Sequence, residues 1–305
     1  MIKPILVTGI HRSGSTWVGK VLAKSSSVCY IHEPFNGMCQ PGMCAVNFPS
    51  VYFHLTKSNS DAFYPALNDL FQLRYNLAAQ LRSVRSPREC ARLIRDYYLF
   101  INDRRVGKVP LVKDPMAILS AQWIAQSFDV NILLLVRHPA AFVSSCLQLG
   151  WGFHFINFIN QPLLLETYFS AYETEIVNYT KNEQSLIDQL SLLWKLIYSV
   201  VAEYQQKYPE WLILKYEEVC KKPLDHFQYI FQQLNLDFTP QIQSYIYNST
   251  NYIQPENIFE EIHSVKRNTQ KQIDIWKMRL SQEQINRIRT QVEEVSNVFY
   301  NDDDW

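Results

Sequence analysis

Residues 4–17 read PILVTGIHRSGSTW, an apolar run followed by a loop with two glycines. Gly9 and Gly14 have the spacing of a phosphate-binding loop, and the residues after them can begin a helix. A strand that enters such a turn and then a helix points several backbone N–H groups, and the positive end of the helix, at one spot. The stretch therefore predicts an anion site. Four side chains of the loop would add donors, namely Arg12, Ser13, Ser15 and Thr16.

The loop lacks the lysine that ATP- and GTP-binding loops carry, because Ser15 stands at that position. In those loops the lysine reaches the β- and γ-phosphates, and the next hydroxyl holds Mg²⁺. No strand-like segment of the chain ends in the aspartate that would complete such a metal site. The sequence thus argues against a kinase or ATPase and predicts no metal. A P-loop nucleotide or small-molecule kinase that uses ATP and Mg²⁺ remains an alternative.

Three further segments have the composition of buried parallel strands: 109–113, 130–137 and 211–218. Segments with helical periodicity lie between them. Strands that alternate with helices predict an α/β fold with a central parallel sheet, whose ligands bind beyond the carboxyl ends of the strands. Residues 36–108 and 151–208 do not fit the alternation. We expect both to be inserts that shape an acceptor pocket within a single domain, 1–305.

A second phosphate site is predicted after the segment 130–137. This segment ends in Arg137, and Ser145 follows eight residues later in the next predicted helix. An arginine at a strand end and a serine about two turns into a helix can converge on a phosphate. A ligand with phosphates at both ends of a nucleoside would span the two sites.

The composition excludes several partners. Basic and acidic residues number 29 each, so no global field attracts nucleic acid or an anionic membrane, and an anion site must be local. No run of 18 apolar residues occurs, and the start of the chain becomes polar too early for a signal peptide. The six cysteines form neither a disulfide framework nor a zinc pattern. We expect a cytoplasmic protein with no membrane span, and the oligomeric state stays open.

The motifs resemble those of the PAPS-dependent sulfotransferases of the carbohydrate and bacterial type. HRSGST resembles their 5′-phosphosulfate loop, and RHPAAFVSS resembles their 3′-phosphate motif. LKYEEVCKKP is similar to their segment near the adenine, and residues 264–284 are similar to a late basic loop that closes over the cofactor. The resemblance implies a three-layer, P-loop NTPase-like fold with a central parallel sheet flanked by helices, PAPS as the sulfonate donor, PAP as the product and no metal.

The same resemblance implies the residues that bind the cofactor. They are Gly9, Arg12, Ser13, Gly14, Ser15, Thr16, Trp17, Arg137, Ser145, Tyr216, Lys266 and Arg267. Trp17 and Tyr216 would lie near the adenine. Which of Lys266 and Arg267 contacts the 3′-phosphate stays open.

In-line sulfonate transfer needs charge stabilisation and a base for the proton of the acceptor. Arg12 would stabilise the leaving phosphate as a permanently charged donor. Glu33, in IHEPFN, is the favoured base, because some carbohydrate members carry a similar Glu-Pro pair after the first helix. His32 and Asp114 are rival bases, and Lys113 would help neutralise the sulfonate. Alternatively, Lys113 and Asp114 form a surface pair that caps the next helix.

The predicted function is transfer of a sulfonate from PAPS to a hydroxyl or amine of a small-molecule or glycan acceptor, in particular a carbohydrate or glycolipid. Aromatic residues in both inserts could stack on a sugar, contact a lipid or belong to the core. Contact with a lipid-linked substrate is compatible with a chain that has no membrane span. A non-catalytic PAP-binding protein is a further alternative, against which the presence of Arg12 and Glu33 argues.

Overall fold

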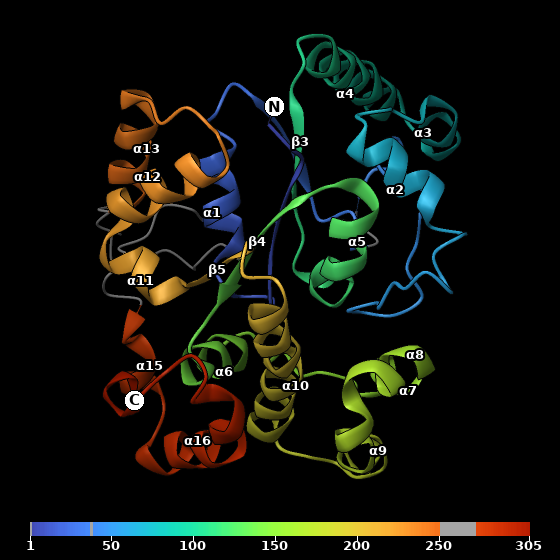
Figure 1. The fold of residues 1–305 in the computed structure, drawn as a ribbon. Coiled ribbons are helices and arrows are strands. Elements are labelled where there is room, and N and C mark those ends of the chain that lie inside the picture. The colour runs from blue at the N-terminus through green and yellow to red at the C-terminus, as the bar shows by residue number, and fades with distance from the viewer. Residues whose placement is uncertain (1, 37–38, 251–272) are drawn as a thin grey trace.

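The computed structural model describes residues 2–36, 39–250 and 273–305. Its centre is a parallel sheet of five strands in the order β2-β3-β1-β4-β5. The strands are β1 (Ile5–Gly9), β2 (Val28–His32), β3 (Val109–Lys113), β4 (Asn131–Val136) and β5 (Leu212–Lys215). The predicted α/β fold is confirmed, and Figure 1 shows helices on both faces of the sheet.

The apolar run that opens the chain becomes the central strand of the sheet. Ile5, Leu6 and Val7 are wholly buried, and successive side chains point to opposite faces. Ile5 and Val7 pack in one core cluster, and Leu6 packs in the other. A strand covered on both faces requires such a continuous apolar run, which explains why this segment could be recognised from the sequence.

Helices from different parts of the chain form the two outer layers (Figure 1). One face of the sheet is covered by α1 (Ser15–Leu22), α11 (Tyr216–Lys221), α12 (Pro223–Gln233) and α13 (Pro240–Thr250). The other face packs against α2 (Tyr64–Phe71), α5 (Ala121–Phe128), α6 (Pro139–Leu147) and α10 (Leu186–Lys207). Near the C-terminus, α15 (Ile275–Arg279) and α16 (Gln282–Ser296) pack against α6.

The two predicted inserts are helical. Residues 36–108 contain α2, α3 (Leu77–Ser83) and α4 (Pro87–Arg105). Residues 151–208 contain α7 (Ile156–Ile159), α8 (Pro162–Leu164), α9 (Glu173–Lys181) and α10. The helical stretch expected from residue 64 onward breaks after α2, where Leu73 has a φ of 49°.

One strand and two element boundaries differ from the sequence-based prediction. The five-residue strand β2 was absent from the predicted set, because its VCYIH run is short and ends in an exposed histidine. The predicted strand 211–218 stops at Lys215, and Tyr216 begins α11. The helix expected before β4 starts as a 3₁₀ helix, Pro115–Ser120, and becomes α5 at Ala121.

Because all five strands are parallel, their carboxyl ends meet at one edge of the sheet. Gly9, His32, Lys113, Val136 and Lys215 end these strands, so the residues that follow them lie in one region. Within the described part of the chain, no helix is both long and apolar enough to span a membrane.

Candidate active site

The loop between β1 and α1 depends on its two glycines. Gly9 has a φ of 147° and Gly14 a φ of 91°, in the region that side chains rarely adopt. A Cβ atom on Gly14 would lie 2.2 Å from the ring of Tyr216, and one on Gly9 would lie 2.6 Å from the carbonyl oxygen of Leu135. Neither position accepts a larger residue, so both glycines let the loop pack tightly against the ends of β4 and β5.

The N-terminus of α1 is open to an anion. Its N-cap is Gly14, and no side chain in the described part of the chain caps the helix there. The first N–H groups of a helix have no partner within the helix, and they carry a partial positive charge. Ser13 and Ser15 are buried beside them and Thr16 is half-buried. The Ser13 hydroxyl has no hydrogen-bond partner among the described residues.

The two predicted phosphate motifs lie next to each other. Arg12 follows β1 and has a φ of 64°. Its Nε donates to Oγ of Ser145, on α6, at 3.0 Å. Nη1 of Arg137, directly after β4, donates to the carbonyl oxygen of Arg12. The residues that the sequence assigned to separate ends of a ligand are thus joined by direct contacts.

Buried groups hold Arg137 from behind. Nε1 of Trp194 donates to the carbonyl oxygen of Arg137 at 2.8 Å. The guanidinium lies 5.3 Å from the ring centre of Tyr216, and its Nε is buried with no hydrogen-bond partner among the described residues. At the next residue, the backbone N–H of His138 donates to Glu217 at 2.9 Å. A buried arginine nitrogen without a partner is the kind of donor that an anionic ligand would satisfy.

Trp17, in the first turn of α1, is buried. Its indole N–H donates to the hydroxyl of Ser249 at 3.1 Å, and its ring packs edge-on against Phe227 and Tyr216. Its contact with a base stays a prediction, as does that of Tyr216. The other two predicted cofactor ligands, Lys266 and Arg267, lie outside the described residues.

An ion pair occupies the ends of β2 and β3. Glu33 follows β2 with a φ of 48°, and its carboxylate accepts from Nζ of Lys113, which is 1% exposed. Nδ2 of Asn36 donates to the other carboxylate oxygen of Glu33 at 3.0 Å. Burial favours a higher pKa for Glu33, but the charge of Lys113 and these hydrogen bonds outweigh it and hold the pKa below its ordinary value. Glu33 is therefore ionised near neutral pH.

Asp114 shapes the turn after Glu33. One oxygen accepts from the N–H of Met116 and the other from the N–H of Phe35. The residue is fully buried, and burial raises its pKa to about 7. Asp114 caps the 3₁₀ helix, as one of the two alternatives predicted. The surface pair of Lys113 and Asp114 in that alternative is wrong, because Lys113 is buried and pairs with Glu33. Both Asp114 oxygens are engaged by the backbone, which suits a structural role.

The histidines of the region differ in exposure. The side chain of His32 is 44% exposed, and its ring lies 3.1 Å from the hydroxyl of Tyr30. His11 adjoins Arg12 in the loop, but no motif in the sequence singles it out. Its Nδ1 lies 2.5 Å from the hydroxyl of Tyr52, and burial, followed by the charge of Arg12, lowers its pKa to about 4. His11 therefore stays neutral and links the loop to the insert 36–108.

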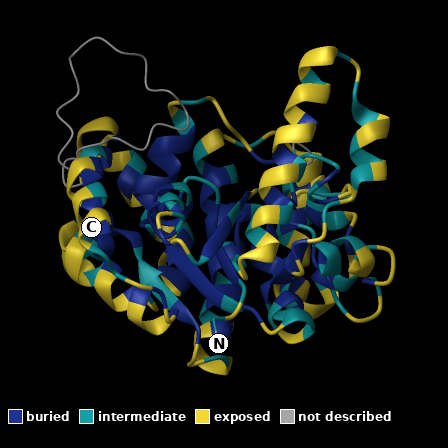
Figure 2. Ribbon diagram, turned by 90° about the horizontal axis from the view of Figure 1, so that it is seen from above, coloured by how far each residue is buried: buried dark blue, intermediate teal, exposed yellow. Residues whose placement is uncertain are grey.

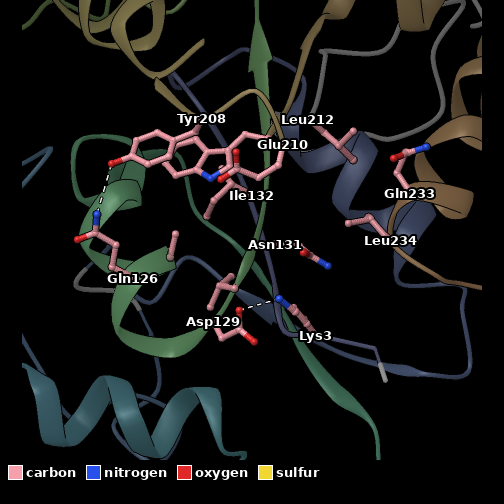
Figure 3. A pocket seen from close by; sticks show the side chains of 13 residues that line it. Lys3, Gln126, Asp129, Asn131, Ile132, Tyr208, Glu210, Leu212, Gln233 and Leu234 are labelled. Atoms are coloured by element: carbon pink, nitrogen blue, oxygen red, sulfur yellow. Dashed lines mark hydrogen bonds and ion pairs between the residues drawn. The ribbon is translucent and has the colours of Figure 1, made fainter. Parts of the chain in front are cut away.

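A surface cavity lies at the opposite edge of the sheet, away from these motifs (Figure 3). It measures about 230 Å³ and lies where β1, β4 and β5 begin. An ion pair of 2.7 Å between Lys3 and Asp129 lies at its side, and the stacked rings of Tyr208 and Trp211 form one wall. Because parallel α/β sheets bind ligands at the carboxyl edge, this cavity is not the candidate site.

The comparisons with known proteins agree with this fold. A model of the sulfotransferase family matches residues 4–240. The sulfotransferase domain from the curacin biosynthetic pathway shares 16% identity over 96% of this chain and 98% of its own, with a TM-score of 0.50, which is a likeness of fold. No curated protein matches the chain.

Two other solved structures are similar at lower scores. The sulfotransferase domain from the Synechococcus PCC 7002 olefin synthase shares 13% identity over 99% of this chain and 97% of its own, with a TM-score of 0.48. The mouse sulfotransferase SULT7A1, complexed with PAP, shares 12% identity over 99% of this chain and 87% of its own, with a TM-score of 0.46.

Proposed function

The chain belongs to the sulfotransferase family, and on that premise we propose that it transfers a sulfonate from PAPS to a hydroxyl or amine of a carbohydrate or glycolipid acceptor. The observation that carries the proposal is the contact of the two phosphate motifs. Arg12 contacts Ser145, and Arg137 contacts the backbone of Arg12. A donor with phosphates at its 5′ and 3′ positions needs two such groups of cations and hydroxyls within one nucleoside length.

The unsatisfied donors of the site fit this ligand. The open N-terminus of α1 and the Ser13 hydroxyl would bind the 5′-phosphosulfate. Nε of Arg137, which has no hydrogen-bond partner among the described residues, would bind the 3′-phosphate together with the hydroxyl of Ser145, which accepts from Arg12. None of these groups requires a metal to bind a phosphate oxygen.

The reacting groups then have complementary tasks. The acceptor oxygen forms a bond to sulfur while the bond from sulfur to the bridging oxygen breaks. Arg12 stabilises the negative charge that develops on the leaving phosphate, since its guanidinium stays protonated. Glu33 takes the acceptor proton, because its carboxylate is ionised and next to Lys113. Lys113 balances the charge of the carboxylate until the proton arrives.

An exposed aromatic side chain supports a sugar acceptor. Trp151, in the insert 151–208, is exposed, and its ring centre lies 6.1 Å from that of His11. An exposed indole near the loop could stack on the apolar face of a sugar ring. Trp151→Ala should raise the KM for a carbohydrate acceptor and leave PAP affinity unchanged. A variant with unchanged kinetics on the best sugar would remove Trp151 from the acceptor site.

Calorimetric titration with PAP, and in parallel with ATP and Mg²⁺, tests the donor. We expect metal-independent binding of PAP and weak binding of ATP. Acceptors would then be screened with radiolabelled PAPS, with carbohydrates and glycolipids against phenols. Tight binding of ATP that depends on Mg²⁺, with weak binding of PAP, would overturn the proposal in favour of a P-loop kinase. PAP binding without transfer to any acceptor would favour a non-catalytic PAP-binding protein.

A further inference from the structure

Helices α3 and α4 form a hairpin at the margin of the molecule. Figure 2 shows this hairpin standing away from the body, with exposed residues along most of its length. Leu93 and Phe100 of α4 are buried on its inner side. Ile94 and Tyr98, one turn apart on the opposite side, are 62% and 67% exposed, and Leu99, farther round the helix, is 51% exposed. Three large exposed apolar side chains on one helix are more than scattered exposure, and they indicate a binding surface.

The same hairpin is strongly basic. Residues 77–105 contain seven arginines and three acidic residues, whereas the whole chain has equal numbers of both signs. The acidic residues already have local partners: Asp96 pairs with Arg95, Asp103 pairs with Lys108, and Glu89 accepts from a backbone N–H. Within the described residues, six of the seven arginines form no ion pair: Arg82, Arg85, Arg88, Arg92, Arg104 and Arg105.

The two features occupy neighbouring stripes of α4. At 3.6 residues per turn, Arg105 continues the stripe of Ile94 and Tyr98 two to three turns on, and Arg88, Arg92 and Arg95 form a second stripe beside it, together with Leu99. A neutral chain has thus concentrated positive charge and exposed apolar surface on one protruding helix. Helices that lie in a membrane interface have this composition, with arginine at the phosphate level, tyrosine at the interface and aliphatic side chains below.

We propose that the α3–α4 hairpin docks the protein on an anionic phospholipid surface. The arginines contact lipid phosphates, and Ile94, Tyr98 and Leu99 enter the boundary between headgroups and acyl chains. A protruding helix with exposed apolar side chains suits a deformable lipid surface. An acidic protein would instead need a groove that is complementary to this helix. It is the alternative partner that the experiments must exclude.

Co-sedimentation with lipid vesicles tests the proposal on the full chain. The protein should bind vesicles of phosphatidylcholine with added phosphatidylserine, and should bind phosphatidylcholine alone far more weakly. Binding should fall when the salt concentration rises, because screening weakens each arginine contact. Cys90 is the one exposed cysteine among the described residues and lies on α4. An environment-sensitive dye on Cys90 should therefore shift to shorter emission wavelength when anionic vesicles are added.

Two variants separate charge from apolar insertion. Arg88→Glu with Arg92→Glu should weaken binding at least about tenfold, since each basic residue near the surface contributes substantially. Ile94→Ser with Tyr98→Ser should abolish the dye shift and leave salt-sensitive attraction. A matched control reverses two exposed lysines elsewhere, Lys57→Glu with Lys181→Glu, and should bind vesicles nearly like the parent. All these residues are exposed, so circular dichroism and melting should be unchanged.

Three outcomes would overturn the proposal. They are the same affinity for neutral and anionic vesicles, the same loss in the Lys57 and Lys181 control, and no vesicle binding at all. If polyglutamate binds in a hairpin-dependent way while vesicles do not, the face is a dock for an acidic protein instead. PAP affinity is independent of these variants, so a failed lipid test leaves the proposed sulfotransferase function untouched.

Discussion

The carboxyl edge of the sheet carries two neighbouring groups of charged residues that are built in opposite ways. At the ends of β1 and β4, Arg12 donates to a serine hydroxyl and Arg137 to a backbone carbonyl. At the ends of β2 and β3, Glu33 and Lys113 neutralise each other. A hydrogen bond to a neutral acceptor leaves the charge of an arginine in place, whereas an ion pair cancels it. The first group is thus suited to binding an anion through Arg137, whereas in the second group Lys113 keeps Glu33 ionised until it takes a proton.

The largest expected effect comes from the first group. Arg12→Ala should lower the rate of transfer on the order of 10³-fold or more, as the loss of an arginine that stabilises a transferring group does. PAP should still bind, because Arg137 contacts the backbone of residue 12 and not its side chain. Radiolabelled transfer and calorimetry with PAP measure the two quantities separately. Arg12→Lys is the matched control and should recover part of the rate, and equal losses of rate and PAP affinity in Arg12→Ala would contradict the assigned role.

The second group should respond in the opposite pattern. Glu33→Gln keeps an oxygen that can accept from Lys113 but cannot take a proton at neutral pH. We expect turnover to fall about 10²-fold or more with PAP affinity unchanged, as for the loss of a general base. His32→Gln, at the neighbouring exposed residue, is the control. If turnover falls in His32→Gln and stays at the parent rate in Glu33→Gln, the base is His32.

Arg137→Ala should affect binding more than chemistry. The side chain has a buried Nε without a partner among the described residues, and a charge-assisted contact to phosphate is worth roughly 10- to 100-fold in affinity. The Kd for PAP, measured by calorimetry, should rise by that factor. Arg74→Ala, remote in the insert 36–108, should leave it unchanged. An unchanged Kd in Arg137→Ala would remove this arginine from the donor site.

The contrast between the two groups also explains which parts of the fold and the site could be predicted from the sequence. The first loop is continuous with its strand, and Arg137 is continuous with its own strand, so the spacing within each motif already encodes its local geometry, and the fold prediction is confirmed. Glu33 and Lys113, by contrast, are 80 residues apart in the sequence. Only the register of β2 beside β3, which places His32 opposite Lys113, brings them together. The role of His11 depends in the same way on Tyr52, far along the chain in an insert without a motif.

The ion pair predicts a shift in pH dependence. Lys113 lowers the pKa of Glu33 through its charge and its hydrogen bond, so Lys113→Met should raise that pKa. If Glu33 must be ionised to act as base, the acidic limb of the pH–rate profile should move to higher pH by a similar amount. Lys20→Met removes a nearby lysine that does not pair with Glu33 and is the matched control. If the acidic limb shifts equally in both variants, or does not shift in Lys113→Met, the ion pair does not set the pKa of the catalytic base.

The smallest expected effect is a change in stability on replacing His138, which follows Arg137 of the first group. Its ring stacks on Trp276 at 4.8 Å and meets Tyr300 and Trp305 edge-on, and neither ring nitrogen has a hydrogen-bond partner among the described residues. Replacing a buried polar ring without partners by an apolar ring of similar shape is neutral or stabilising. His138→Phe should therefore change the free energy of unfolding in urea by about 1 kcal/mol or less, towards greater stability.

The pH dependence of stability supplies the second readout for this substitution. Burial, followed by the positive charges of Lys277 and Arg137, lowers the pKa of His138 to about 3. A depressed pKa means that the folded protein binds this proton less well than the unfolded chain does, so stability falls as the pH drops below 6.5 towards 3. His138→Phe should lose that part of the acid sensitivity. If the variant is destabilised by more than about 2 kcal/mol, the imidazole makes a hydrogen bond in the folded protein that stacking against Trp276, Tyr300 and Trp305 does not replace. That result would contradict the prediction.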